Sequence, residues 1–317
     1  MQKVKFALTH ASGMLAEALL ERMADAGIKS ENIVLLDQEQ HEGERISYAG
    51  SFITLQDQDA YDYENLTAVL LLESDPTLQG LLQHADCYVF SHQFDPQTPN
   101  VLSAEMSEQH AWPEAPCFIR MASAEQATLI PLLKIIHTDF GLKSIDVVNV
   151  ETAAAYGKAG VKDLAHQTIS LLNTQDVKSS VFPLALAFNM MPLEVEDDVE
   201  SSLLTHLQLA GVKCSAQRML VAAFHGLAIS VMLETDHEIS IDALSQQFGT
   251  LSGVKVSQQS VSPMTDCKEG FDIHISGLRH PQKDVKRLQF WIIADSVRNG
   301  LVQNYLNTME ILLKSHL

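Results

Sequence analysis

The first 37 residues predict a strand, a glycine-containing turn, a helix and a second strand. The apolar run Lys3–Thr9 has the length of a buried strand, and the turn His10–Gly13 follows it. Apolar side chains recur at helical spacing over Met14–Ala26, and the next apolar run, Asn32–Leu36, leads to Asp37. This order opens dinucleotide-binding domains of the Rossmann type, in which turn glycines let a pyrophosphate rest on the helix N-terminus.

The charge balance excludes two classes of partner. The chain has 317 residues, which is long enough for two domains, and its net charge is −19 at pH 7. Phosphate backbones and anionic lipid surfaces would repel such a protein, so we expect no nucleic acid and no membrane as a partner. No run approaches the ~18 apolar residues of a membrane span. The sequence therefore predicts a soluble protein of the cytoplasm.

The cysteines and histidines have neither disulfide nor metal-ligand spacing. Cys87, Cys117, Cys214 and Cys267 are scattered without close pairs, which favours reduced thiols in the cytoplasm. The histidines of the predicted helices lack acidic partners at the spacing that metal ligands have. We therefore expect no metal site.

A second unit of strand, turn and helix lies in the middle of the chain. Cys117–Arg120 is predicted to be a short strand, and small or polar residues follow it as a turn. The next helix ends at Gly141, before a buried strand over Ser144–Val150. A loop that leads into a helix N-terminus is a usual place for a nucleophile, because free backbone N–H groups there stabilise a thiolate or an oxyanion.

This stretch resembles the nucleophile segment of the aspartate-semialdehyde dehydrogenase family. That family carries Asn-Cys-Ser/Thr-Thr, a Lys about ten residues later, Phe-Gly-Ile-Lys and then Gly-Lys-Ala-Gly. Here Lys134, the run Asp139–Lys143 and the run Gly157–Gly160 fall into the same register. Ten residues before Lys134, Ala124 takes the position of the catalytic cysteine, and Glu151 stands where the family has an active-site Gln.

The resemblance continues through Arg218–His225 and the Trp291–Asn304 ending, so it covers most of the chain. It implies an α/β fold with a Rossmann-type parallel-sheet domain plus an α+β dimerisation domain with a large mixed sheet. We expect residues 1–123 with the C-terminal helix 295–317 to form the dinucleotide-binding domain, and residues 124–294 to form the dimerisation and substrate domain. Because the family dimerises through that sheet, the resemblance also implies a homodimer.

The family's substrate motif, Arg-x-Pro-Val-x-x-Gly-His, is kept in part. Its Arg, which binds the substrate carboxylate, is Arg218, and its His, the general acid/base, is His225. Leu220 replaces the Pro and Phe224 the Gly. If Gln217–Met232 is one straight strand, side chains seven residues apart lie on opposite faces and need a bend to converge. For His225, two interpretations stay open: a retained acid/base, or a core histidine that a backbone carbonyl satisfies.

The resemblance further implies that the nucleophile is missing. The family reaction passes through a thiohemiacetal and a thioester on the cysteine, and Ala124 has no sulfur. Ser123 would need a general base, and Cys117, a core thiol seven residues upstream, is too far along the strand to replace the nucleophile. Glu151 adds a negative charge to a pocket for an anionic substrate, so we expect it to pair with Arg218 or to repel that ligand.

The predicted cofactor turn departs from the family pattern Gly-Ala-Thr-Gly-x-Val-Gly. Only the middle glycine, Gly13, is kept between His10 and Ala16. The imidazole of His10 would project where the phosphates of a cofactor pass. The candidate cofactor-binding residues are His10, Ser12, Gly13, Met14, Asp37 and Gly157.

The residues after the second strand favour NAD over NADP. An acidic residue at the position of Asp37 usually binds the ribose of NAD, and the alternative is a solvated acidic loop that binds nothing. The Arg and Lys that hold the 2′-phosphate of NADP in the family are Gln40 and Glu44 here. We therefore do not expect NADP, because carboxylates would repel its phosphate.

Two other segments lack the family's anion contacts. The segment 92–116 has no counterpart of a phosphate-binding Arg, and we interpret it as a shortened loop. The acidic helix predicted over Val195–Ala210 has no counterpart of a substrate-contacting Lys.

Three hypotheses of function follow, since function must be argued from the site and not from the fold. The first is a non-catalytic, dimeric binding or regulatory paralogue of aspartate-semialdehyde dehydrogenase, which the missing thiol favours. The second is an NAD-dependent oxidoreductase of the aldehyde or oxo-group class in amino-acid metabolism, with altered chemistry. The third is a partner subunit that forms mixed dimers with an authentic family enzyme.

Overall fold

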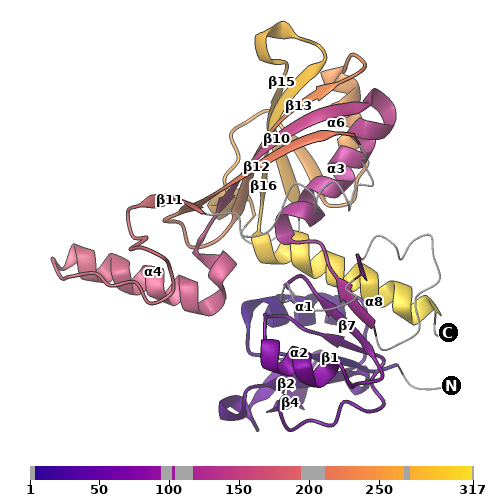
Figure 1. The fold of residues 1–317 in the computed structure, drawn as a ribbon, viewed down its shortest axis with the longest axis vertical. Coiled ribbons are helices and arrows are strands. Elements are labelled where there is room, and N and C mark those ends of the chain that lie inside the picture. Colours follow the sequence, from indigo (N-terminus) through magenta and orange to yellow (C-terminus); the bar gives the residue numbers. More distant parts are fainter. Residues whose placement is uncertain (1–3, 94–101, 104–116, 194–210, 268–271, 316–317) are drawn as a thin grey trace. The chain divides into compact units, whose positions relative to one another are not determined.

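The computed structural model describes residues 4–93, 102–103, 117–193, 211–267 and 272–315. The chain divides into two compact units, each with its own seven-stranded sheet (Figure 1). Unit 1 comprises Met1–Ser123 and Leu301–Leu317, and unit 2 comprises Ala124–Gly300.

All strand pairs in the sheet of unit 1 are parallel, in the order β5-β2-β1-β6-β7-β9-β8. The central strands β1 (Phe6–Leu8), β6 (Ala68–Leu70) and β7 (Tyr88–Ser91) are buried along their whole length, as in parallel sheets covered on both faces. The strand order reverses between β1 and β6, and the carboxyl end of such a switch point is where Rossmann domains bind ligands. The other strands are β2 (Ile33–Asp37), β5 (Gln56–Asp57), β8 (Leu102–Ser103) and β9 (Cys117–Arg120).

Three α-helices, a hairpin and the 3₁₀ helices Ser30–Asn32 and Glu39–His41 complete the described part of unit 1. Helix α1 (Met14–Asp25) follows β1, and α2 (Pro76–Leu82) is capped by a side chain that precedes it. The C-terminal helix α8 (Gln303–Ser315) belongs to this unit, since the hydroxyl of Tyr305 donates to the carbonyl of Leu71 at 3.3 Å. The hairpin of β3 (Arg45–Tyr48) and β4 (Ser51–Thr54) is a further element of this unit.

The sheet of unit 2 is mixed, in the order β11-β12-β10-β13-β16-β15-β14. The β10–β12 and β14–β15 pairs are parallel, and the other pairs are antiparallel. A parallel-sheet domain and a domain with a large mixed sheet confirm the predicted fold class. The strands are β10 (Leu142–Glu151), β11 (Met190–Leu193), β12 (Lys213–Val221), β13 (Leu227–Thr235), β14 (Val254–Ser257), β15 (Ile273–Arg279) and β16 (Arg287–Ala294).

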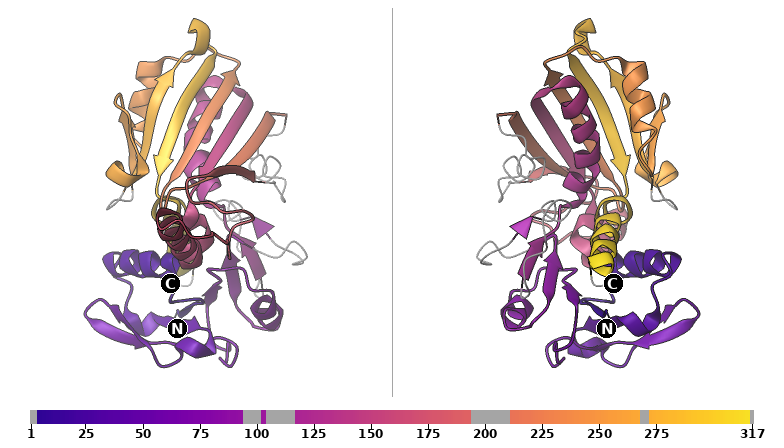
Figure 2. Two further views of the ribbon diagram at one scale, coloured as in Figure 1. Left: turned by 90° about the vertical axis from the view of Figure 1, so that its left-hand side faces the viewer. Right: turned by 90° about the vertical axis from the view of Figure 1, so that its right-hand side faces the viewer.

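Helices α3 (Ala124–Phe140) and α6 (Ile241–Phe248) cover one face of this sheet (Figures 1 and 2). The core is apolar because alternate residues of each strand point towards these helices, for example Ile229 and Val231 of β13. Glycine ends α3, as the sequence predicts, since Gly141 adopts φ +70°. The remaining elements are α4 (Gly157–Leu172), α7 (Pro263–Asp266), the 3₁₀ turns Ala153–Tyr156 and Pro281–Lys283, and the π-helical segment Ser296–Val302.

Candidate functional site

The turn between β1 and α1 closes on itself around His10. The backbone of His10 lies in the left-handed region at φ +51°, which glycine adopts most readily. Its carbonyl accepts a hydrogen bond from the N–H of Gly13 at 2.9 Å, and the N–H of Ala11 donates to the carbonyl of Leu36 at 3.0 Å. An imidazole therefore occupies a backbone position that suits the first glycine of the family pattern.

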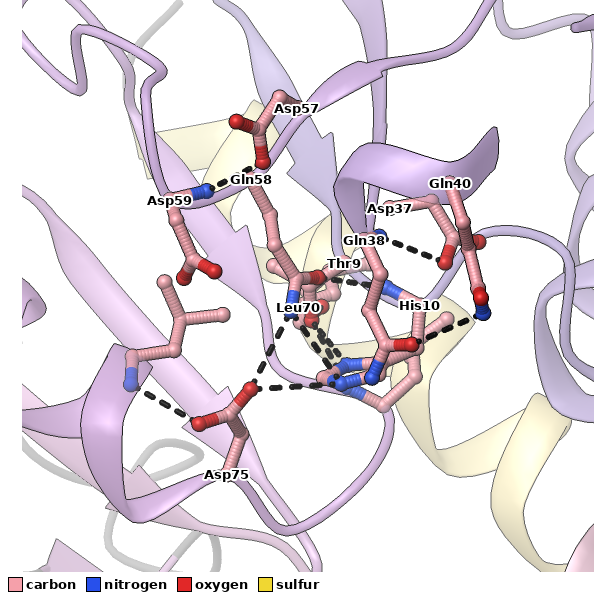
Figure 3. A network of polar contacts seen from close by, with 12 residues as sticks. Thr9, His10, Asp37, Gln38, Gln40, Asp57, Gln58, Asp59, Leu70 and Asp75 are labelled. Carbon is pink, nitrogen blue, oxygen red and sulfur yellow. Dashed lines mark hydrogen bonds and ion pairs between the residues drawn. The ribbon is translucent and has the colours of Figure 1, made fainter. Parts of the chain in front are cut away.

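The side chain of His10 points into unit 1, and only 8% of the residue is exposed. Its Nδ1 lies 3.3 Å from the hydroxyl of Thr9, and its Nε2 lies 3.4 Å from Nε2 of Gln58 and 3.5 Å from Oδ2 of Asp75. Gln58 also donates to Asp75 at 3.2 Å (Figure 3). These residues surround the imidazole with polar partners from separate loops of unit 1. No motif marks Gln58, whereas Asp75 precedes a proline that begins α2 and is recognisable as a helix cap.

Asp37 is buried at the end of β2, and backbone groups bind its carboxylate. Oδ2 accepts a hydrogen bond from the N–H of Ser12 at 2.6 Å, and Oδ1 accepts one from the N–H of Gln38 at 2.8 Å. Only 3% of Asp37 is exposed, whereas Glu39 and Gln40 are exposed. The interpretation as a solvated acidic loop is therefore wrong for Asp37, because the N–H groups of the neighbouring turn replace water around its carboxylate.

The arrangement of this turn departs from the open glycine turn on which a Rossmann domain holds a dinucleotide. The pyrophosphate needs close approach to an open glycine turn, but the turn carries the enclosed imidazole of His10. Both oxygens of Asp37 already accept backbone hydrogen bonds. A Cβ at Gly13 would lie 3.0 Å from the carbonyl oxygen of His10 and 3.1 Å from Oε1 of Glu73, so the turn is tight around this glycine. The other candidates, Ser12 and Met14, are half-buried beside it. We call Thr9, His10, Asp37, Gln58 and Asp75 the turn cluster.

Ala124 begins helix α3 in unit 2, and its side chain is a methyl group packed partly against the core of that unit. Gly300, in the π-helical segment, lies directly against it. A Cβ at Gly300 would be 2.6 Å from the carbonyl oxygen of Ala124 and 2.7 Å from its Cα. The start of the π-helical segment is fixed by Asp295, whose carboxylate accepts two backbone hydrogen bonds. The N-terminal end of α3 is thus closely packed, and residue 124 presents no nucleophilic atom.

Glu151 and Arg218 form an ion pair across neighbouring strands of unit 2. Oε1 of Glu151 accepts a hydrogen bond from Nε of Arg218 at 2.6 Å and lies 2.5 Å from its Nη2. The parallel register of β10 and β12 places Asn149 opposite Arg218, and Glu151 follows two residues later on the same face. The pairing of Glu151 with Arg218 that the sequence predicts is therefore present, and the strand register produces it.

Asn149 joins this pair to a second carboxylate. Its Nδ2 donates to Oε2 of Glu125 at 2.6 Å and to Oε1 of Glu151 at 3.0 Å. Only 4% of Asn149 is exposed, and among the described residues its Oδ1 has no hydrogen-bond partner. The alternation along β10, which places Asn149 on the same face as Glu151, is the signal that identifies it. We call Glu125, Asn149, Glu151 and Arg218 the strand cluster.

The two carboxylates set the electrostatics of the strand cluster. Burial alone would lower the pKa of Arg218, but the charges of Glu151 and Glu125 outweigh burial, so its pKa is raised above the usual value. The side chain of Arg218 is 32% exposed and that of Glu151 is 7% exposed. The guanidinium therefore stays charged and is balanced from the protein side by a nearly enclosed carboxylate.

The prediction of one strand-like run over Gln217–Met232 is wrong. Strand β12 ends at Val221, β13 begins at Leu227, and β10 lies between the two strands in the sheet. The connecting loop is tied to the residue that follows β10, because the hydroxyl of Thr152 donates to the carbonyl of Gly226 at 2.9 Å. An apolar run alone does not reveal such a crossing.

His225 lies in this loop and is exposed. The interpretation as a core histidine is therefore wrong, because the residue is on no strand and faces solvent. Within the described part of the chain, its side chain has no hydrogen bond or ion pair, whereas Arg218 is held by Glu151. The structure thus brings Arg218 and Glu151 together and leaves His225 outside that contact.

The run Gly157–Gly160 forms the first turn of α4. Gly157 adopts φ +63°, and a Cβ there would meet open space. At Gly160 a Cβ would lie 2.4 Å from the carbonyl oxygen of Ala153, so this glycine allows α4 to pack on the preceding 3₁₀ turn. The second glycine of the run therefore has a packing role, and Gly157 is in unit 2 while the other cofactor candidates are in unit 1.

Two predicted segments fall wholly or mostly outside the described residues. The structure describes none of Val195–Ala210, and of 92–116 only residues 92–93 and 102–103. In the described ranges, no three His, Cys, Asp or Glu side chains form a group that could hold a metal ion. No helix among the described residues is both long and apolar enough to cross a membrane.

Two of the described thiols, Cys87 and Cys267, are poor nucleophiles. Burial raises the pKa of Cys87 to about 12 and that of Cys267 to about 11, so both stay protonated at neutral pH. Cys214 is a half-buried cysteine of β12. The side chain of Cys117 lies outside the described part of the structure.

Comparison with known proteins gives consistent matches. Residues 133–299 match the family described as "Semialdehyde dehydrogenase, dimerisation domain". The chain is 22% identical over 334 residues to a protein of Pseudomonas aeruginosa named USG-1 protein homolog, covering 100% of this chain and 99% of that protein. It is also 22% identical over 335 residues to aspartate-semialdehyde dehydrogenase 2 of Vibrio cholerae, covering 99% of each.

Two solved structures share the fold along 100% of both chains. Aspartate semialdehyde dehydrogenase II from Vibrio cholerae, complexed with ASA, has a TM-score of 0.85 at 18% sequence identity. A probable aspartate-semialdehyde dehydrogenase from Pseudomonas aeruginosa has a TM-score of 0.85 at 21% identity. At these identities the likeness establishes the fold, and the chemistry must be argued from the side chains.

Proposed function

Because the chain belongs to the semialdehyde dehydrogenase family, we propose that it is an aspartate-semialdehyde dehydrogenase-like binding or regulatory protein that does not form the family's thioester. The observation that carries this proposal is the methyl group of Ala124 at the N-terminal end of α3, where the resemblance places the nucleophile. Thioester formation needs a sulfur nucleophile, and a methyl group has no lone pair to attack a carbonyl. The raised pKa values of Cys87 and Cys267 argue against a substitute thiol at either position.

We also propose that unit 1 binds neither NAD nor NADP in the manner of a Rossmann domain. The enclosed His10 and the backbone-bound carboxylate of Asp37 support this proposal. A ligand that used this turn would have to displace the imidazole and compete with two backbone N–H groups for one carboxylate. The hypothesis of an NAD-dependent oxidoreductase is the less favoured one for this reason.

The matched dimerisation domain supports the formation of a dimer. We propose that two copies pair through the sheet face of unit 2 that lies opposite α3 and α6. Trp291 and Met232, which are 38% and 41% exposed, point away from the core side of their strands. Large apolar side chains on an open sheet face are typical of protein contacts. Analytical ultracentrifugation checks this, with a dimer expected for the wild type and a monomer for Met232→Asp.

The test of the main proposal is a turnover assay with aspartate semialdehyde, phosphate and each cofactor. The wild type is expected to produce no NADH or NADPH above the rate without protein. Intact-mass measurement after incubation with the semialdehyde is expected to show no adduct on the wild type. The matched variant, Ala124→Cys, is expected to gain an adduct at residue 124, because the thiol restores the missing nucleophile. Turnover by the wild type would contradict the proposal.

A further inference from the structure

One oxygen atom of Glu151 receives three donors from the protein itself. Oε1 contacts Nε and Nη2 of Arg218, and it also accepts a hydrogen bond from Nδ2 of Asn149 at 3.0 Å. The Nε and Nη2 groups form one edge of the guanidinium, and that edge is one of those through which arginine binds a carboxylate with two parallel hydrogen bonds. Glu151 therefore stands where the carboxylate of an anionic ligand could bind.

The position of Glu151 is fixed by the fold. It lies at the end of β10, and the parallel pairing of β10 with β12 sets its distance from Arg218. Its side chain is only 7% exposed, so an incoming anion would have to displace a nearly enclosed carboxylate. The displaced carboxylate would lose its counter-ion inside the protein, which is strongly unfavourable.

The carboxylate of Glu125 also disfavours the binding of an added anion near Arg218. The charge of Glu125 adds to that of Glu151 in raising the pKa of Arg218, so the guanidinium is influenced by both anions. Asn149 holds the two acids in place, since its single Nδ2 donates to each. An added anion would meet this arrangement of like charges next to the only cation of the strand cluster.

We propose that Glu151 is a specificity-determining residue that occupies the carboxylate-binding edge of Arg218 and thereby excludes anionic ligands from the strand cluster. The inference rests on the proposed function only in taking the chain as a binding protein, and it takes the strand cluster as the ligand site of unit 2 because the family resemblance places a substrate carboxylate at Arg218. Its consequence is that this site takes ligands without a carboxylate at Arg218, in contrast to the anionic substrate that the family resemblance implies.

The experiment uses succinate as the anionic probe and isothermal titration of the full chain at constant ionic strength. The Glu151→Gln variant removes the internal anion and keeps an oxygen acceptor of the same length. It is expected to bind succinate at least about tenfold more tightly than the wild type, the factor that one charge-assisted hydrogen bond supplies. The gain should vanish in the double variant Glu151→Gln/Arg218→Gln, because the guanidinium is then absent.

The matched control is Asp242→Asn, which removes one negative charge from an exposed position of α6 and should leave succinate binding unchanged. If Glu151→Gln does not fold, Glu151→Met provides a neutral side chain of similar length, with the same gain expected. A folded variant that binds succinate no better than the wild type would overturn the proposal. So would succinate binding by the wild type that depends on Arg218.

The succinate titration and the turnover assay test the two proposals independently. Turnover of aspartate semialdehyde by the wild type would contradict the proposed loss of thioester chemistry, which concerns Ala124. If Glu151→Gln gains no succinate binding, only the role assigned to Glu151 is contradicted. The proposal that residue 124 lacks a nucleophile is unaffected.

Discussion

The turn cluster of unit 1 and the strand cluster of unit 2 both hold charged side chains in places that suit a ligand, but they do so with different partners. In the turn cluster, backbone N–H groups bind both oxygens of Asp37, and the imidazole of His10 is enclosed. In the strand cluster, the partners are two side chains, Glu151 and Arg218, and nearly a third of Arg218 is open to solvent.

This difference separates a structural role from a selective one. Groups bonded to partly buried backbone are part of the folded state, since removing them leaves donors whose hydrogen bonds water replaces only in part. A partly exposed ion pair contributes less to stability, because water replaces the lost partner. We therefore expect substitutions in the turn cluster to destabilise unit 1, and substitutions in the strand cluster to change binding more than stability.

The largest effect is expected for Asp37→Ala. The variant leaves the N–H groups of Ser12 and Gln38 without their acceptor, at an expected cost of about 3 kcal/mol in the free energy of unfolding of unit 1. This loss is measured by urea unfolding in which hydrogen exchange of peptides from β1 and β2 monitors unit 1. The control is Asp57→Ala, since Asp57 is the register neighbour of Asp37 but is half-buried, and it should cost less than about 1 kcal/mol. Equal losses of stability in Asp37→Ala and Asp57→Ala would contradict the structural role assigned to Asp37.

A smaller effect is expected at His10, where two variants separate the side chain from the backbone. His10→Ala loses the contacts with Gln58 and Asp75 and keeps a Cβ at positive φ, for an expected loss of about 2 kcal/mol. His10→Gly relieves the left-handed backbone and should be about 1 kcal/mol more stable than His10→Ala. The same exchange experiment measures both. If the alanine variant is the more stable one, the positive φ of His10 stores no strain.

Removing the charge of Glu151 should cost little. Glu151→Gln is expected to lower the free energy of unfolding of unit 2 by about 1 kcal/mol or less, because Arg218 is partly exposed and retains water as a partner. Hydrogen exchange of peptides from β10 and β12 checks it. A loss as large as that of Asp37→Ala would mean that the strand cluster is as structural as the turn cluster.

An effect of similar size is expected from the pH dependence of stability that His92 gives to unit 1. Burial lowers the pKa of His92 from 6.5 to about 4, and its Nδ1 lies 3.1 Å from the hydroxyl of Tyr305. Because the unfolded chain binds the proton more readily, stability is complete above pH 6.5 and decreases as the pH falls towards 4. We expect a loss of about 1 kcal/mol, less than the full shift gives, since the residue is only half-buried. The difference in stability between wild type and His92→Gln, measured from pH 7 to 4, should change over this interval, and a constant difference would contradict the assignment.

Much of the fold is predictable because it is marked by local residues, such as a glycine that ends a helix, or by the periodic spacing of apolar residues. Helical spacing from Met14 and the glycine at 141 locate α1 and the end of α3. The motifs of the resemblance then supply the fold class that periodicity alone cannot give. The pairing of Glu151 with Arg218 is one of two alternatives open from the sequence, since the resemblance places both residues at the substrate pocket.

The missed features depend on contacts between distant segments. Asp37 is buried only because the N–H of Ser12, 25 residues earlier, reaches its carboxylate. The break after Val221 depends on a loop that crosses the end of β10, and the apolar run around it gives no sign of the crossing. Gln58 has no local signal at all, because its role comes from contacts with His10 and Asp75. Such features are set by tertiary structure.

We propose that the chain's own side chains occupy the places where the family resemblance puts ligands. The most direct test is a thermal-shift titration of the wild type with NAD and with NADP. We expect no saturable rise in melting temperature with either, because His10 and Asp37 are already engaged within unit 1. A saturable rise with either cofactor would contradict this expectation, because a ligand that binds the folded state stabilises it by an amount that grows with the logarithm of the ligand concentration relative to Kd.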